Sequence, residues 1–588
     1  MNQRFSLKEI LIVFWNSVLK DYKSRLGLCF LLIVFAAAAE LLTLSAIFPF
    51  LSVLSSPDLI FNDPRAAWLI TSLNINSPEG LILPFAIFFC VAASTGSLVR
   101  LASNYLSIRM AFSISHKVSI SIFRNALHRT YAKHVASNNN EVLATLSTKL
   151  ERVVFSLILQ VFLLMTALII SLIILSALIY INPMLTLSIA VICGIFYCAV
   201  ILLINKLLLR ESEVIAAANT KQIKTIRESL GGIRDVLINN AHNFYYSIFE
   251  TADYQLRRGQ AINMFASMSP RFLIESLGLI IIVIAAYYFS QKTSFITAIP
   301  VLGALAIGAQ KLLPLFQQFY VAWTSLKGNY ESLQDVVHLL NEGPQKTETP
   351  ITQSLTFNDS IQLRGVSFQH SGTNDNIFHD LNFSIHPGDR IGIIGKTGAG
   401  KSTLVDIIAG LLFPTEGAVL VDGVALKQNN ASSWMASLAY VPQNIFLSDE
   451  SILENIAIGE NKNNIDLNLI DLALEHASLS EFISLLPEGV NTKVGERGIK
   501  ISGGQKQRIG IARAIYKKAS LIIFDEATSA LDAATETDVM DAIYRLDSNI
   551  TMLVIAHRTS TLKNCNKIIK LENNAIEILT PKDILEEI

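Results

Sequence analysis

The sequence has little charge and few cysteines. Only 16% of its 588 residues are charged, where about 25% is usual in soluble proteins, and 51% are hydrophobic. The net charge is −1, so no excess of basic residues points to a nucleic-acid partner, and we expect none. No C-x-x-C pair occurs and four of the five cysteines lie in apolar stretches, which disfavours a disulfide framework or a zinc site. The cysteines are Cys29, Cys90, Cys193, Cys198 and Cys565.

Long apolar runs fill the amino-terminal half instead. A membrane span needs about 20 mostly apolar residues, and six stretches qualify. They are Leu26–Val53, Leu81–Ile108, Val153–Ile181, Leu185–Leu208, Phe272–Phe289 and Ile296–Trp323. We therefore predict an all-α, six-span transmembrane domain over residues 1–340, preceded by an amphipathic helix, Leu7–Tyr22, at the inner membrane surface.

Basic residues predict the orientation of these spans. Most lysines and arginines of this half lie between spans two and three and between spans four and five, while the other connections hold few. The positive-inside rule then places the N-terminus, both long connections and the carboxyl-terminal half in the cytoplasm. Both connections have helical composition, so we expect them to extend the spans beyond the bilayer. Their polar tips, near His134–Glu141 and Asn239–Phe244, are candidates for docking on a nucleotide-binding domain.

Four charged residues lie inside or at the ends of spans: Glu40, Arg100, Glu275 and Lys311. A charge in the bilayer is costly, so it faces either a partner or a water-filled cavity. Both roles stay open for Arg100 and Glu275. For Glu40 and Lys311, which lie deeper, the sequence favours a cavity.

A glycine-rich loop marks the carboxyl-terminal half. Gly395-Lys396-Thr397-Gly398-Ala399-Gly400-Lys401-Ser402 fits G-x-x-x-x-G-K-[ST], and it stands between a short apolar strand and a helical pattern that continues through Thr403. In such a loop the backbone N–H groups surround phosphates, Lys401 reaches the β- and γ-phosphates, and Ser402 ligates Mg²⁺. The loop therefore predicts a site for ATP and Mg²⁺.

A second motif completes this site. Leu521–Phe524 reads as a buried strand that ends in Asp525 and Glu526. Asp525 is placed to hold Mg²⁺ through water, and Glu526 to polarise the attacking water. From about Leu355 onward strands alternate with helices, which predicts an α/β P-loop nucleotide-binding domain over residues 355–588, after a polar linker at 341–354.

The segment Ile501-Ser502-Gly503-Gly504-Gln505 precedes a helical stretch and offers a hydroxyl and free N–H groups to a γ-phosphate. It resembles the signature motif of ATP-binding cassette (ABC) transporters, with Ile501 where leucine is usual. The resemblance implies three further roles. Gln443, in Tyr440-Val441-Pro442-Gln443, would be the Q-loop glutamine, which contacts Mg²⁺ and couples the ATP site to the membrane domain. Asp532 would belong to the D-loop at a dimer interface, and His557 would contact the γ-phosphate.

One position departs from the family. Members usually stack adenine on an aromatic residue, commonly tyrosine, after the first strand of this domain, and here His370 stands there. Imidazole offers less stacking surface than a phenol, so weaker adenine contacts are expected.

The resemblance covers nearly the whole chain and matches an exporter half-transporter. In this family the glycine loop of one subunit and the signature motif of another enclose each ATP. Because every motif is intact here, the resemblance implies a homodimer with two competent sites.

Three membrane stretches resemble bacterial lipid-linked oligosaccharide flippases: Glu40 with Phe48-Pro49-Phe50, Pro270–Glu275, and Lys311–Pro314. This implies transport of a lipid-linked oligosaccharide or a related amphipathic glycolipid across a bacterial cytoplasmic (inner) membrane. Arg100, Arg271 and Lys311 would line a basic cavity, although Glu40 and Glu275 would repel a diphosphate unless paired. The alternative is an exporter of peptides, drugs or simple lipids. A non-transporting ABC ATPase acting on DNA or ribosomes is disfavoured by the six apolar runs.

Overall fold

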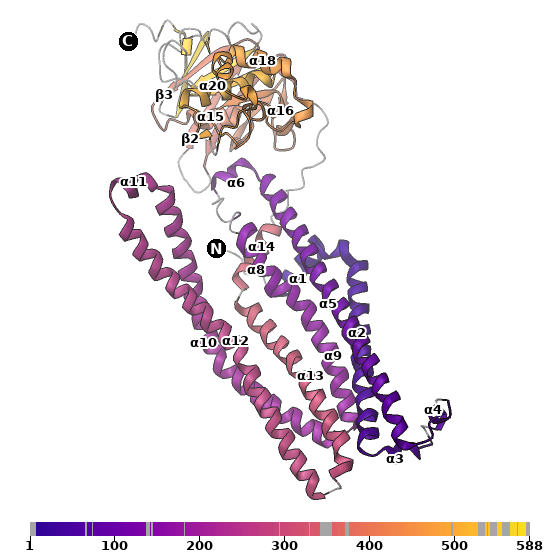
Figure 1. The fold of residues 1–588 in the computed structure, drawn as a ribbon. Coiled ribbons are helices and arrows are strands. Elements are labelled where there is room, and N and C mark those ends of the chain that lie inside the picture. The colour runs from indigo at the N-terminus through magenta and orange to yellow at the C-terminus, as the bar shows by residue number, and fades with distance from the viewer. Residues whose placement is uncertain are drawn as a thin grey trace. The chain divides into compact units, whose positions relative to one another are not determined.

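Figure 1 shows the chain as a computed structural model, and two compact units share its residues. The first unit comprises Met1–His128 and Asn138–Gly343, the second Arg129–Ser137 and Pro344–Ile588. The structure describes all residues except 1–6, 65–66, 73, 137–141, 143–144, 182, 293–294, 329, 342–354, 371–375, 496–497, 527–535, 538, 541–549, 556–561, 563–564, 573, 582 and 584–588.

Long helices build the first unit, as the apolar runs predict. The predicted spans lie in α2 (Lys23–Ser55), α5 (Ile82–Leu127), α9 (Leu159–Ile181), α10 (Pro183–Gly231), α12 (His242–Lys292) and α13 (Phe295–Gly328). The third predicted span begins earlier than α9, in α8 (Leu150–Val153) and a π-helical segment, Val154–Ile158. The shorter helices are α1 (Leu7–Ser17), α3 (Pro57–Phe61), α4 (Ala67–Ser72), α11 (Ile233–Ile238) and α14 (Tyr330–Asn341), and a second π-helical segment is Thr145–Lys149.

Four helical segments among the described residues are long and apolar enough to cross a membrane. They are Leu19–Ser55, Pro78–Leu127, Leu159–Ile181 and His242–Ile281. The predicted fourth and sixth spans lie in α10 and α13, which are not among these four. The first unit is therefore a multi-span helical domain, and the count of six spans stays a prediction.

The helices of this unit pack along most of their lengths. α2 runs along α5, and α10 runs along α12, with α11 forming the turn between them (Figure 1). Gly96 permits close packing of α5 on α2, since a Cβ there would lie 2.8 Å from Thr43 Oγ1. Side chains that face away from the packed helices are apolar, as at Leu98 and Leu101 of α5, both exposed. This outward apolar surface fits a hydrocarbon environment.

The predicted amphipathic helix at the N-terminus is present but shorter than expected. It ends at Ser17 and is followed by a separate 3₁₀ turn, Leu19–Tyr22. Ile10 and Phe14 are buried against a cluster that includes residues of α14, while Trp15 on the other face is exposed. The prediction of one helix over Leu7–Tyr22 is therefore wrong in its extent but matches the observed amphipathic pattern.

Two sheets form the core of the second unit, which also contains α6 (Tyr131–Ala136). The four-stranded sheet has the order β2-β1-β4-β5 and is antiparallel. The six-stranded sheet has the order β10-β9-β3-β8-β7-β6, and its neighbours are parallel except β9 and β10. The strands are β1 (Ile361–Gln369), β2 (Asn376–Ile385), β3 (Arg390–Gly395), β4 (Glu416–Val421), β5 (Val424–Ala425), β6 (Leu438–Val441), β7 (Leu521–Asp525), β8 (Thr551–Ile555), β9 (Lys567–Glu572) and β10 (Ala575–Leu579).

The six-stranded sheet has an apolar core on each face. Along β7, Ile522 and Phe524 join one cluster and Leu521 and Ile523 join the other, which is the two-residue alternation of a strand buried on both sides. The helices of this unit are α15 (Lys401–Ile408), α16 (Ala431–Ala436), α17 (Ile452–Ile456), α18 (Leu467–His476), α19 (Ser480–Ser484) and α20 (Gly503–Tyr516). The prediction of an α/β nucleotide-binding domain is confirmed. Since the carboxyl ends of parallel strands share one edge, the residues that follow β3, β6 and β7 gather there.

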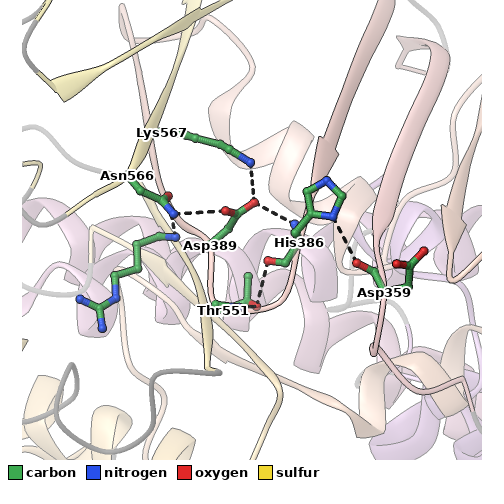
Figure 2. Close-up of polar contacts among 8 residues, drawn as sticks. Asp359, His386, Asp389, Thr551, Asn566 and Lys567 are labelled. Carbon is green, nitrogen blue, oxygen red and sulfur yellow. Dashed lines mark hydrogen bonds and ion pairs between the residues drawn. The ribbon is translucent and has the colours of Figure 1, made fainter.

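A polar network closes the opposite edge, where β3, β8 and β9 begin (Figure 2). Asp389 Oδ2 accepts hydrogen bonds from Lys567 Nζ at 2.7 Å and from the His386 backbone N–H at 2.8 Å, while Asn566 Nδ2 donates to Oδ1 at 3.2 Å. Thr551 Oγ1 donates to the carbonyl of His386 at 3.4 Å. Burial alone would raise the pKa of Asp389, but the hydrogen bonds from Lys567 and His386 outweigh burial and hold the pKa below its usual value. Asp389 thus stays ionised and ties the amino ends of these strands together.

Candidate active site

The glycine loop lies between the end of β3 and the start of α15, as the motif predicts. Gly400 adopts a left-handed φ of +91° at the N-cap of α15. A Cβ there would lie 2.4 Å from Ile377 Cγ2, and a Cβ at Gly395 would lie 2.6 Å from the Leu571 carbonyl oxygen. Glycine is therefore required at both positions. The tip of the loop, at Lys396–Gly398, is exposed.

Lys401 is the first residue of α15, and its side chain folds back over the loop. Its Nζ donates to the carbonyl oxygens of Gly395 at 2.8 Å and Lys396 at 3.2 Å. Ser402 follows with an exposed hydroxyl, and Thr403 is half-buried beside it. The positive charge of the Lys401 ammonium group and the positive end of the α15 helix dipole thus lie beside the glycine loop together. This electrostatic environment favours binding of a phosphate group.

The two predicted carboxylates lie at the carboxyl end of β7, where Asp525 is the last residue of the strand and Glu526 follows it, and each accepts a hydrogen bond from its own donor. Asp525 Oδ2 accepts a hydrogen bond from Tyr440 Oη at 2.8 Å, and Glu526 Oε2 accepts one from Gln443 Nε2 at 2.6 Å. Glu526 has a left-handed φ of +49°, which costs a non-glycine residue about 1–3 kcal/mol. Strain of this kind is typical of residues aimed at a functional site.

A third carboxylate lies close to this pair. Asp406, on α15, is half-buried, and burial together with the charge of Asp525 raises its pKa to about 6. Burial also raises the pKa of Asp525 itself. The sequence motifs predict no role for Asp406 or for Tyr440. An acidic residue within the apolar run Leu404–Ile408 was the only signal available for Asp406.

Ser402, Gln443 and Asp525 provide hydroxyl, amide and carboxylate oxygens. Hard oxygen donors of this kind suit Mg²⁺, which in nucleotide sites takes one or two protein carboxylates together with phosphate oxygens and water. No group of three or more His, Cys, Asp or Glu residues that would hold a metal occurs among the described residues. The oxygen donors of Ser402, Gln443 and Asp525 fit a magnesium ion that binds together with a nucleotide.

The signature segment forms the N-terminus of α20. Ser502 Oγ accepts a hydrogen bond from the Gln505 backbone N–H at 3.3 Å, and Gln505 Oε1 accepts one from the Ser502 backbone N–H at 2.9 Å. This capping box fixes the rotamer of Ser502. With its oxygen used as an acceptor, the hydroxyl retains its proton for donation to a phosphate. Gly503 and Gly504 add the free N–H groups of the first helical turn.

Three other predicted site residues have different outcomes. His370 directly follows β1, is exposed, and packs edge-on against Phe368 with ring centroids 5.1 Å apart. Asp532 and His557 lie outside the described residues, so their predicted roles stay predictions.

The charged residues of the membrane helices do not form one cluster. Lys311 Nζ on α13 lies 2.8 Å from Glu40 Oε1 on α2, and the Glu40 side chain is only 7% exposed. The structure therefore has an ion pair between these two residues, and the cavity that the sequence favours for them stays a prediction. Arg100 is half-buried on α5, while Arg271 and Glu275 are exposed on α12.

Comparison with known proteins agrees with this geometry. The family model described as "ABC transporter" matches residues 378–529, and the one described as "ABC transporter transmembrane region" matches residues 26–308. The chain is 30% identical over 498 residues to an ATP-dependent lipid A-core flippase of Burkholderia orbicola (strain AU 1054), which covers 82% of this chain and 81% of the relative.

This chain belongs to the ABC transporter family.

Two further similarities define its type. An ATP-dependent lipid A-core flippase of Paraburkholderia xenovorans (strain LB400) is 29% identical over 517 residues, covering 84% of this chain and 83% of the relative. A solved bacterial Atm1-family ABC exporter with ATP bound has the same fold, with a TM-score of 0.77, 22% sequence identity and 96% of each chain covered. The ABC transporter described here is thus an exporter half-transporter, with a helical transmembrane domain followed by an ATP-hydrolysing domain.

Proposed function

We propose that this ABC transporter uses ATP hydrolysis to flip a lipid with a large anionic sugar head, such as a lipid-linked oligosaccharide or a related amphipathic glycolipid. The similarity to two lipid A-core flippases over about four-fifths of the chain carries this proposal. These relatives are named as flippases of lipid A-core, which favours a lipid substrate for this chain as well.

The charges of the membrane helices support an anionic head group. Because Lys311 pairs with Glu40, one of the two acidic residues that would repel a diphosphate is neutralised. Arg100 and Arg271 carry no recorded hydrogen bond or ion pair among the described residues, which leaves their charges for a phosphate. The head would cross beside these cations while the lipid tail stays in the bilayer.

The ATPase site supplies the driving force. Lys401 and the loop N–H groups bind the β- and γ-phosphates, and Ser402, Gln443 and Asp525 would hold Mg²⁺, which would supply positive charge to the phosphate oxygens. Glu526 accepts a proton as water attacks the γ-phosphorus and ADP leaves. His557 contacts the γ-phosphate, Asp532 lies at the subunit interface, and His370 stacks on adenine.

Two chains form the working unit in this proposal, a homodimer in a bacterial cytoplasmic membrane with both ATPase domains in the cytoplasm. Each ATP lies between the glycine loop of one chain and the Ser502 segment of the other. ATP binding closes the pair of ATPase domains, the long helices transmit this closure to the spans, and hydrolysis releases it.

The test is a flipping assay in proteoliposomes. A fluorescent lipid-linked oligosaccharide is supplied with and without ATP, and Glu526→Gln protein serves as the hydrolysis-deficient control. We expect ATP-dependent translocation by the wild type alone. Parallel vesicles carry a phosphorylated lipid A-type glycolipid or a cationic drug dye.

Each outcome of this assay has a clear meaning. Transport of the lipid-linked oligosaccharide supports that compound class as the substrate. Transport of the lipid A-type glycolipid alone would identify a different glycolipid as the substrate. Transport of the dye alone, beside normal ATPase activity, would favour the alternative of a peptide, drug or simple-lipid exporter. Arg100→Gln should lower glycolipid transport about tenfold, whereas Arg109→Gln, further along α5, should not.

A further inference from the structure

Tyr440 contacts the magnesium-side carboxylate directly. It lies on β6, opposite Ile523 in the parallel pairing with β7. Its side chain reaches toward the carboxyl edge of the sheet, where Oη donates to Asp525 Oδ2 at 2.8 Å. Both residues are half-buried, so the hydrogen bond is partly shielded from water.

This hydrogen bond has a consequence for metal binding. A carboxylate at a strand end rotates freely about its side-chain bonds unless a partner holds it. Tyr440 occupies one oxygen of Asp525, which orients the carboxylate plane and leaves Oδ1 for a metal-bound water. An ordinary phenol has a pKa of about 10, so the Tyr440 hydroxyl keeps its proton and remains a donor near neutral pH.

The neighbouring acidic groups favour such a partner. Glu526 follows Asp525 directly and repels its charge, Asp525 in turn repels the charge of Asp406 on α15, and the positive charge of Lys401 offsets part of the repulsion at Asp525. Negative charges of this kind repel one another in a half-buried site and favour rotation of Asp525 away from them. A neutral donor on Asp525 offsets that repulsion without adding a charge.

We propose that Tyr440 is a positioning residue for Asp525, which holds it in the orientation that binds magnesium with the nucleotide. This inference rests on the proposed role of Mg²⁺ at this site. Tyr440 is three residues before Gln443, which donates to Glu526. One short segment therefore holds both carboxylates of the active site, and any displacement of this segment changes metal binding and the catalytic base together.

The test uses the full-length transporter and a Tyr440→Phe variant, which keeps the ring and removes only the hydroxyl. Tyr516→Phe is the matched control, because Tyr516 Oη donates to another carboxylate of the same domain, Glu460 Oε2, at 2.7 Å. Both are made in a Glu526→Gln background, and binding of a fluorescent ATP analogue is titrated with Mg²⁺ and, separately, in EDTA.

We expect Tyr440→Phe to raise the Mg²⁺ concentration for half-maximal nucleotide binding about tenfold. Tyr516→Phe should leave it unchanged, and all variants should bind equally in EDTA. With Glu526 restored, ATPase activity of Tyr440→Phe should recover at high Mg²⁺.

Three results would overturn the inference. The Mg²⁺ titration of Tyr440→Phe could match that of Tyr516→Phe, which would make the contact structurally incidental. The affinity of Tyr440→Phe for the ATP analogue could fall as much in EDTA as it does with Mg²⁺, which would indicate a general packing defect. The parent protein could also bind nucleotide equally well with and without Mg²⁺. That result would overturn the proposed role of Mg²⁺ itself, whereas the first two results would overturn only the role of Tyr440.

Discussion

Adjacent residues at the end of β7 have different partners and different proposed roles. Asp525 is held by a phenol that leaves one oxygen for metal binding, whereas Glu526 is held by an amide and has a left-handed backbone. The hydrogen bond from the Gln443 amide orients the Glu526 carboxylate, as a positioned proton acceptor requires. The proposed roles of the two carboxylates, metal binding for Asp525 and proton acceptance for Glu526, are thus matched by different hydrogen-bond partners.

Glu526→Gln should abolish most hydrolysis and keep nucleotide binding. An amide has nearly the same shape but accepts no proton, so we expect kcat to fall by about 10²–10⁴-fold. Steady-state phosphate release measures the loss, and binding of a fluorescent ATP analogue measures what remains. Turnover within about twofold of wild type would remove Glu526 from the proposed role of base.

Asp389→Asn should destabilise the ATPase domain without touching the active site. Asparagine keeps one acceptor oxygen but loses the ionic contact with Lys567, so we expect a loss of about 1–3 kcal/mol in the free energy of unfolding. Thermal unfolding of the full transporter measures this loss of stability. Asp449→Asn is the control for the loss of one negative charge, because Asp449 is exposed.

The same variant gives a pH test with a defined sign. The folded pKa of Asp389 lies below the unfolded value of 3.8, so its contribution is fully present above that value and is lost as pH falls through the lower folded pKa. The stability difference between wild type and Asp389→Asn should therefore be constant from pH 7 to about 5 and should narrow below about pH 4. A difference that grew on acidification would contradict the network in Figure 2.

At the scale of elements, an ion pair joins two membrane helices. Glu40 on α2 and Lys311 on α13 lie 2.8 Å apart, with side chains 7% and 24% exposed. A lone charge in the bilayer is costly, whereas a paired one is tolerated. This explains why the sequence keeps two opposite charges within otherwise apolar runs.

Neutralising one member should therefore be worse than neutralising both. We expect Glu40→Gln or Lys311→Gln to destabilise the transmembrane domain by about 3–5 kcal/mol and the double variant to recover most of this. Thermal unfolding in detergent measures the coupling. The exposed pair Lys224–Glu228 on α10, 3.7 Å apart, serves as the control, with an expected coupling below about 1 kcal/mol.

Additive losses would mean that Glu40 and Lys311 are not coupled. A double variant that regains stability but transports no glycolipid would show that this ion pair also acts in transport, beyond its role in stability.

At the scale of the molecule, the proposed dimer shares its ATP sites between chains. Lys401→Ala removes phosphate contacts from the glycine loop, and Ser502→Arg blocks the donor at the N-terminus of α20. Each homodimer should have under about a tenth of wild-type ATPase activity, since a charged hydrogen bond contributes about 1.5–3 kcal/mol.

Mixed dimers then identify which chains build a site. A Lys401→Ala chain paired with a Ser502→Arg chain retains one intact site if sites are shared, so activity should return. A doubly substituted chain paired with wild type should have no intact site. If each chain formed its own site, the two mixtures would show the reverse pattern. Tandem affinity tags isolate the heterodimers for phosphate-release measurements.

Local sequence patterns were enough to predict the fold class and to locate the segments of the candidate ATPase site. The glycine loop, the Asp525-Glu526 pair and the Ser502 segment are local patterns, because each is formed by one turn or one strand end whose residues are adjacent in the chain. Apolar runs likewise predicted the membrane helices, since hydrocarbon must surround them. Helix ends were not predicted as well, because helix termination depends on the packing of neighbouring elements. The N-terminal helix, for example, ends at Ser17 and not at Tyr22.

Contacts between residues far apart in the chain could not be predicted from local patterns and are seen in the folded structure. Tyr440 and Asp525 are 85 positions apart and come together through the pairing of β6 with β7. Glu40 and Lys311 become an ion pair through the packing of α2 against α13. No local pattern encodes such contacts, because strand order and helix packing are set by burial of the whole apolar surface rather than by any one segment.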